Sequence, residues 1–77
     1  MKKISLTHMK PNHKGTVLEI AGGLNLENKL AGMGIYKGKD IIKLSHIGLQ
    51  GPVVIKSGRS IIALGHGIAA KIIIGIE

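Results

Sequence analysis

Four histidines are the residues of this chain whose side chains are best suited to chemistry. Imidazole binds transition metals and exchanges protons near neutral pH. His8 and His13 share one polar segment and could meet a metal ion together with His46 or Glu19. The competing interpretation is exposed loop histidines, because a zinc site needs three or four converging ligands and no acidic cluster accompanies them. We therefore expect at most a weak metal site, with His8, His13 and His46 as its candidate ligands.

Carboxylates are too few and too scattered for acid–base catalysis. The chain has only Glu19, Glu27, Asp40 and Glu77, and no two of them fall at a spacing that shares one helical face. General acid–base catalysis needs a group with a shifted pKa in a cleft, which a small aliphatic domain rarely offers. The lack of cysteine excludes disulfides, thiol nucleophiles, zinc ribbons and iron–sulfur clusters. The sequence therefore predicts no enzyme activity and no cofactor.

The glycine-rich run from Gly32 to Gly38 resembles a nucleotide-binding loop but departs from its pattern. The third glycine comes one residue late for G-x-G-x-x-G, and the run follows a predicted helix where the motif requires a strand. We interpret Gly34 as the end of that helix and Gly38 as a turn residue.

Positive charge dominates the chain: eleven lysines and arginines stand against four acidic residues, for a formal net charge of +7. This balance implies an anionic partner, whether nucleic acid, an acidic lipid surface or an acidic protein face. Tyr36 is the only aromatic residue, so specific base stacking is not expected. The competing interpretation is a solvated face without a partner. The candidate partner-facing residues are basic side chains of the central part of the sequence: Lys37, Lys39, Lys43, Lys56 and Arg59.

Twelve glycines punctuate short runs of Val, Ile and Leu, which is typical of tightly turned β structure. Alternating apolar residues predict strands over 16–20, 39–47, 53–56, 60–64 and 72–76, while 1–6 alternates only weakly. A turn at 57–59 joins two of them, and Gly51 and Pro52 end the loop before strand 53–56. About five short antiparallel strands close best as a small barrel, because closure removes exposed edges.

One segment changes period: Leu26, Leu30 and Met33 fall at i, i+4 and i+7, which predicts a short α-helix. Asn25 is its expected N-terminal cap and Gly34 its left-handed C-terminal residue. A single helical turn is expected over 68–71. The expected core consists of apolar residues from the helix and strands: Leu26, Leu30, Met33, Val53, Leu64 and Ile72.

The length of the chain and its lack of cysteine indicate the number of domains and the cellular compartment. At 77 residues the sequence predicts one domain, residues 1–77. A small secreted domain usually needs disulfides, so the lack of cysteine favours a reducing cytosol. The N-terminal segment carries two lysines with no apolar run behind them, unlike a signal peptide. The longest apolar run has four residues, far short of the roughly 20 that span a bilayer. We expect a cytoplasmic protein.

The order of several short motifs resembles the FeoA family of small cytoplasmic proteins of bacterial ferrous iron uptake. The family has G-x-V-x-x-I, then L-x-x-(R/K)-L-x-x-(L/M)-G-(I/L)-x-x-G, then G-P-V-x-(I/V), and then two shorter apolar pieces. Lys29 stands where the family often has arginine, and Ala69-Ala70 where Glu-Ala is frequent. The matching residues, between Ile4 and Ile76, are Gly15, Val17, Ile20, Leu26, Lys29, Leu30, Met33, Gly34, Ile35, Gly38, Gly51, Pro52, Val53, Ile55, Ile62, Ala63, Leu64, Gly65, Ala69, Ile72 and Ile74.

This resemblance implies an SH3-like barrel that is not an enzyme. It implies a docking and regulatory role on the membrane-embedded ferrous iron transporter, whose cytoplasmic part is a GTP-binding domain; contact with the membrane would be through that partner alone. Related domains occur at the C-termini of metal-dependent repressors. Two alternatives therefore stay open: a basic barrel that binds nucleic acid, and a metal-sensing module with transition-metal binding.

Overall fold

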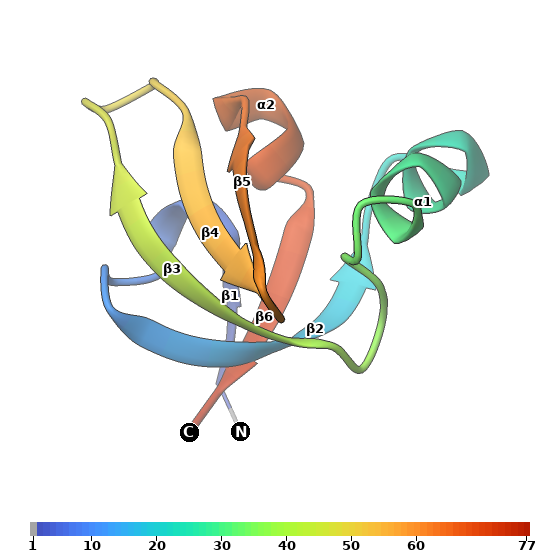
Figure 1. Cartoon of the computed structure of the whole chain (residues 1–77), viewed down its shortest axis with the longest axis horizontal. Coiled ribbons are helices and arrows are strands. Elements are labelled where there is room, and N and C mark those ends of the chain that lie inside the picture. The colour runs from blue at the N-terminus through green and yellow to red at the C-terminus, as the bar shows by residue number, and fades with distance from the viewer. Residues whose placement is uncertain (1) are drawn as a thin grey trace.

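The computed structural model describes residues 2–77 and shows a mainly β protein built around one sheet (Figure 1). Within these residues the strands are β1 (Lys2–Ser5), β2 (His13–Ile20), β3 (Asp40–His46), β4 (Val53–Ser57), β5 (Ser60–Leu64) and β6 (Ile72–Ile76). The helical elements are the 3₁₀ turn η1 (Leu6–His8), α1 (Leu24–Ala31) and α2 (His66–Ala69). The predicted mainly β class is confirmed, and the weakly alternating N-terminal segment adds a strand to the expected five.

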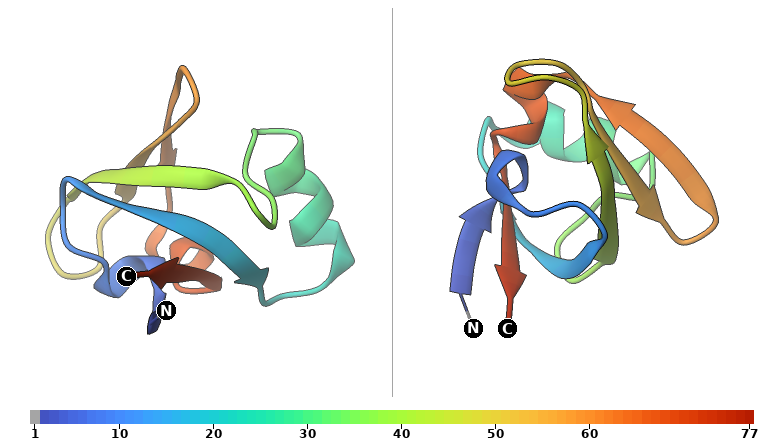
Figure 2. Two further views of the ribbon diagram at one scale, coloured as in Figure 1. Left: turned by 90° about the horizontal axis from the view of Figure 1, so that it is seen from below. Right: turned by 90° about the vertical axis from the view of Figure 1, so that its left-hand side faces the viewer.

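Antiparallel pairing runs through the whole sheet in the order β1-β6-β2-β3-β4-β5. The sheet bends at β2, whose first half pairs with β3 and whose second half pairs with β6. Register shifts in the β2–β6 and β3–β4 pairs accompany this bend, which curls the sheet into a small barrel (Figure 2). The hydrogen-bonded order ends at β1 and β5. The small antiparallel barrel expected from the sequence is confirmed, and β1 and β5 are its two edge strands.

Gly15 allows β2 and β6 to approach each other closely at the bend. Its backbone is buried, and a Cβ at this position would overlap the side chain of Ile74 and lie 3.1 Å from the carbonyl oxygen of Gly75. A residue with a side chain would force the two strands apart. The absence of a side chain at Gly15 is thus a packing requirement of the barrel.

The core fills the inner face of the curled sheet. Of the residues expected there, Leu30, Val53, Leu64 and Ile72 are buried and Leu26 is partly buried against them. Met33 is 37% exposed, so its predicted place in the core is wrong. The buried apolar side chains are Leu6, Met9, Val17, Ile20, Leu30, Ile35, Ile41, Val53, Ile55, Leu64, Ala69, Ile72 and Ile74.

The end of α1 explains why Met33 faces outward. The N–H of Ile35 donates to the carbonyl of Leu30, and the N–H of Gly34 donates to that of Ala31. Gly34 has φ +86°. These bonds form a Schellman motif, in which the residue after the left-handed glycine packs back onto the helix. The inward position is therefore taken by Ile35, which is fully buried, and Met33 is left on the outside of the turn.

Both helices begin earlier than the sequence predicts. The N-cap of α1 is Gly23, with no side-chain bond, so Asn25 lies inside the first turn and its predicted capping role is wrong. α2 begins at His66, two residues before the expected turn over 68–71. α2 packs against η1 and buries Ala69. In residues 2–77, neither helix is long and apolar enough to cross a membrane.

Candidate functional site

Basic side chains meet where the α1–β3 connection reaches the turn between β4 and β5. A Cβ at Gly58, in that turn, would lie 3.7 Å from Nζ of Lys39, so the amine of Lys39 is at the tip of the hairpin. Arg59 follows Gly58 in the turn and is exposed. Two of the predicted partner-facing residues, Lys39 and Arg59, are thus brought together from segments 20 residues apart in the sequence.

Lys56 and Ile61 extend this basic area along the outer face of the sheet. The two residues are directly opposite each other in the β4–β5 pair, so their side chains share a face. Lys56 is exposed and Ile61 is 68% exposed. β5 is also an edge strand: it pairs with β4 on one side, and the backbone groups on its other side are not bonded to a strand among the described residues. We call Lys39, Lys56, Arg59 and Ile61 the hairpin surface.

One partly buried hydrogen bond fixes the two segments of the hairpin surface to each other. The hydroxyl of Ser57 donates to the carbonyl oxygen of Gly34 at 2.7 Å, and Ser57 is 5% exposed. Ser57 is the last residue of β4, and Gly34 begins the connection that leads through the turn at Gly38 to Lys39. This bond therefore positions the α1–β3 connection against the hairpin.

Lys37 stands apart from the hairpin surface. Its Nζ lies 3.9 Å from a carboxylate oxygen of Glu27 on α1, and both side chains reach solvent. An exposed ion pair of this kind contributes roughly 0–1 kcal/mol. Lys37 is therefore an exposed cation whose charge is partly matched by a neighbour on its own chain.

Lys43 is buried, so its predicted place on a partner-facing surface is wrong. Only 2% of the residue is exposed. Its Nζ donates to three backbone carbonyl oxygens: 3.1 Å to Leu6, 3.1 Å to Thr7 and 2.6 Å to Met9. Lys43 faces inward because it shares with Ile41 the side of β3 that is turned toward the core. Its cation holds η1 and the residue after it against the sheet.

The backbone of Lys43 bonds to the later part of the loop between β1 and β2. Its carbonyl accepts a hydrogen bond from the N–H of Asn12 at 2.6 Å, and Asn12 adopts φ +66°.

Burial also lowers the pKa of the Lys43 amine below its ordinary value, because the ammonium loses contact with water. Lys43 is therefore a structural cation, and its role is to order the loop between β1 and β2.

The histidines come together in a pairing that the sequence does not show. Nε2 of His46 lies 3.4 Å from Nδ1 of His66, with ring centroids 5.5 Å apart and ring planes 25° apart. His8 lines the same pocket, which has a volume of about 510 Å³ between η1, the β3–β4 loop and α2. His13 does not line this pocket; it lies at the start of β2. The predicted set of His8, His13 and His46 is therefore not assembled.

His66 was missed because its partner lies 20 residues away and no helical or loop spacing connects the two. In the part of the chain that the structure describes, no group of three or more His, Cys, Asp or Glu side chains is placed to hold a metal ion. Among the three histidines that line the 510 Å³ pocket, His46 and His66 are the pair within hydrogen-bond distance of each other.

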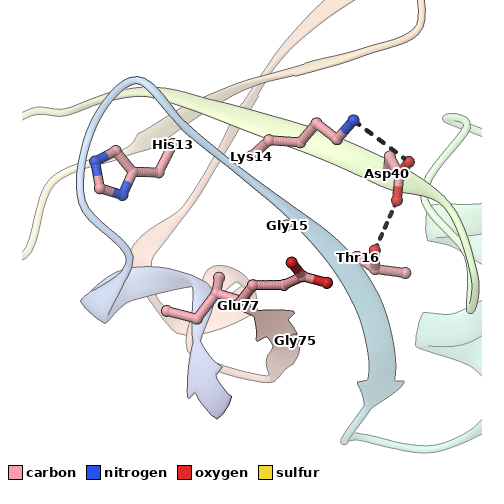
Figure 3. Close-up of a pocket in the computed structure, with 8 residues that line it drawn as sticks. His13, Lys14, Gly15, Thr16, Asp40, Gly75 and Glu77 are labelled. Atoms are coloured by element: carbon pink, nitrogen blue, oxygen red, sulfur yellow. Dashed lines mark hydrogen bonds and ion pairs between the residues drawn. The ribbon is translucent and has the colours of Figure 1, made fainter. Parts of the chain in front are cut away.

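A second hollow, of about 610 Å³, lies beside β2 near the end of β6 (Figure 3). Asp40 lies on its wall, where it accepts a 2.6 Å hydrogen bond from the hydroxyl of Thr16 and lies 3.9 Å from Nζ of Lys14. Glu77 lines the hollow as well, and the ring of His13 is directed away from Asp40 (Figure 3). The carboxylate of Asp40 thus joins β2 to β3 and is not placed beside an imidazole.

Comparisons with known proteins identify a family and several solved structures that share this fold. A family model described as the FeoA domain matches residues 4–75. The crystal structure of an iron uptake regulatory protein (FeoA) is 33% identical, over 97% of this chain and 97% of that chain, with a TM-score of 0.86. Iron(II) transport protein A from Clostridium thermocellum is 28% identical, over 90% of this chain and 43% of that chain, with a TM-score of 0.80. No curated protein matches the chain.

The same fold also occurs in part of a transcriptional repressor. A manganese-dependent transcriptional repressor is 19% identical over 94% of this chain and 40% of that chain, with a TM-score of 0.83. An identity this low shows a shared fold and nothing more. The two kinds of likeness together confirm the predicted SH3-like class.

Proposed function

The chain belongs to the FeoA family, and we propose that it is a non-enzymatic accessory protein of ferrous iron uptake that docks in the cytoplasm on the GTP-binding part of the membrane iron transporter. Family membership supports a part in iron uptake, and the 33% identical relative is described as an iron uptake regulatory protein. The transporter as partner, and regulation as the outcome of docking, are the finer parts of this proposal.

The observation that carries the proposal is the hairpin surface. It combines the positive charges of Lys39, Lys56 and Arg59 with the exposed apolar side chain of Ile61, beside the free edge of β5. Basic groups around an apolar contact steer an acidic partner into place and then allow it to bury apolar area. An edge strand offers the partner backbone donors and acceptors as well. These features suit binding of a protein.

The arrangement of the acidic residues supports binding over catalysis. Asp40 is held by Thr16 and Lys14, and Glu27 lies near Lys37. Glu19 and Glu77 are exposed, and neither is recorded in an ion pair among residues 2–77. We therefore assign the chain no reaction of its own.

The test measures association with the purified GTP-binding domain of the transporter at low ionic strength. The variant Lys39→Glu/Arg59→Glu reverses charge on the hairpin surface, and Lys2→Glu/Lys3→Glu makes the same change on exposed positions of β1. We expect the hairpin variant to slow association at least about tenfold and to weaken its salt dependence, with little change for the β1 variant. Lys43 is left intact because it is buried.

Two results would overturn the proposal. One is the absence of binding by the unaltered protein at low salt. The other is an equal loss of association in the two charge-reversed variants, since that would reflect net charge alone. A parallel titration with single-stranded RNA tests the nucleic-acid alternative: salt-sensitive micromolar binding by RNA, without binding to the transporter domain, would favour it.

A further inference from the structure

We propose that His46 and His66 form an exchangeable site for a divalent transition-metal ion, separate from the hairpin surface. Their nitrogens Nε2 and Nδ1 are 3.4 Å apart. Zinc bonds to imidazole nitrogen are about 2.0–2.1 Å long, so two imidazoles on one tetrahedral zinc place their nitrogens roughly 3.3 Å apart. The observed spacing already matches the separation that a shared metal ion requires.

The rings are also turned the right way. Their centroids are 5.5 Å apart while the two nitrogens are 3.4 Å apart, so the nitrogens face each other across the gap. Without a metal ion, an N–H on one ring can donate to the lone pair on the other. With a metal ion, both lone pairs are needed, and the ring protons must sit on Nδ1 of His46 and Nε2 of His66. Binding therefore requires one ring to change tautomer.

Both ligands are fixed by regular structure. His46 is the last residue of β3, where it is opposite Val53 in the ladder to β4. His66 is the first residue of α2, and its carbonyl accepts the N–H of Ala70 at 2.9 Å. Each side chain is partly exposed, so an ion can enter from solvent. A metal ion would join the end of β3 to the start of α2 with little reorganisation of either.

The lining of this pocket differs from the chain as a whole, which is strongly positive. The pocket contains no lysine and no arginine among its eight lining residues. It also presents the hydroxyl groups of Ser5 and Thr7 and the third imidazole, His8, all in or next to η1. Two imidazoles fill only half of a tetrahedral shell, and water can occupy the rest. Such a site favours zinc, copper, nickel or ferrous iron and releases them readily.

The test follows imidazole nitrogens by two-dimensional ¹H–¹⁵N NMR during titration with zinc chloride near neutral pH. Nε2 of His46 and Nδ1 of His66 should move together toward metal-bound shifts, while the ring nitrogens of His13 stay unchanged. Calorimetry should show at least about a tenfold loss of affinity in His46→Gln and in His66→Gln. His13→Gln is the matched control, and the amide NMR spectrum of each variant checks its fold.

Two further arms make the assignment specific. Lowering the pH from about 7.5 to about 5.5 should weaken zinc binding at least about tenfold, because imidazole binds metal only when it is neutral. The charge-reversed Lys39→Glu/Arg59→Glu variant should bind zinc as the parent does, which separates this site from docking. No binding at millimolar zinc would overturn the proposal. So would an equal loss in His13→Gln, which would mean an adventitious ion only.

Discussion

The ammonium nitrogen of Lys43 lies 2.6 Å from the carbonyl oxygen of Met9, and the two residues are 34 positions apart in the sequence. This contact joins the middle of β3 to the residue that ends the 3₁₀ turn η1. The carbonyls of Leu6 and Thr7 complete the set around the same nitrogen. One buried cation therefore holds the N-terminal loop against β3.

We expect Lys43→Met to destabilise the protein by about 2–4 kcal/mol, because the three carbonyl oxygens lose a charged donor in a site that water does not reach. Urea unfolding followed by circular dichroism measures this change. Lys39→Met serves as the matched control, since Lys39 is partly exposed and has no recorded hydrogen bond through Nζ among the described residues. A loss below about 0.5 kcal/mol for Lys43→Met would contradict the structural role.

The same residue predicts a rise in stability at alkaline pH. Burial lowers the pKa of Lys43 in the folded protein below the ordinary 10.5 of the unfolded chain. Between these two pKa values the unfolded chain holds more protons, so the free energy of unfolding increases with pH. Lys43→Met lacks this contribution. The difference in unfolding free energy between the parent and Lys43→Met should therefore widen as pH approaches 10.5, and urea titrations of both proteins across that range measure it. A constant difference would refute the shift.

Gly51→Ala should destabilise the protein by about 1–3 kcal/mol, because its Cβ would overlap the carbonyl oxygen of Ile47 and force the backbone to move. The N–H of Ile47 bonds to the carbonyl of Pro52, so this loop has little freedom to adjust. Gly67→Ala is the informative counterpart. It lies in α2, where an added Cβ meets nothing within 4 Å. This second change should stabilise the protein by about 0.5–1 kcal/mol in the same thermal or urea assay.

Ser57→Ala should cost about 1 kcal/mol, since the carbonyl of Gly34 loses its 2.7 Å partner. The change should also loosen the α1–β3 connection and speed amide hydrogen exchange in residues 35–39. Ser60→Ala is the control, because Ser60 is exposed and directly opposite Ser57 in the hairpin. Equal exchange rates in the two variants would show that this bond does not position Lys39.

The bounds of several strands could be predicted from the local pattern of apolar residues in the sequence. Strands β5 and β6 have the predicted bounds, and β4 is one residue longer than predicted. Isoleucine-rich segments between glycine turns leave little choice of structure, because alternation places one side of each strand inward. The apolar stripe of α1 likewise identified Leu26 and Leu30 as inward residues.

The errors arise where a distant partner or a backbone reversal decides the outcome. Period alone could not show that the chain turns back at Gly34 and buries Ile35 in place of Met33. Alternation put Lys43 on the same side of its strand as Ile41, yet the carbonyls that make its burial tolerable are 34 to 37 residues away. The approach of His66 to His46 depends on α2 packing against η1, a tertiary contact with no local signature.

The pairing of β1 with β6 has a consequence for how this unit can be combined with others. Lys2 is directly opposite Ile76, and the two ends of the chain leave the sheet together (Figure 1). Neighbouring strands are about 4.8 Å apart, so the unit could be spliced into a surface loop of a host protein across a gap of that width. Circular permutants joined through a short Gly-Ser link should fold for the same reason.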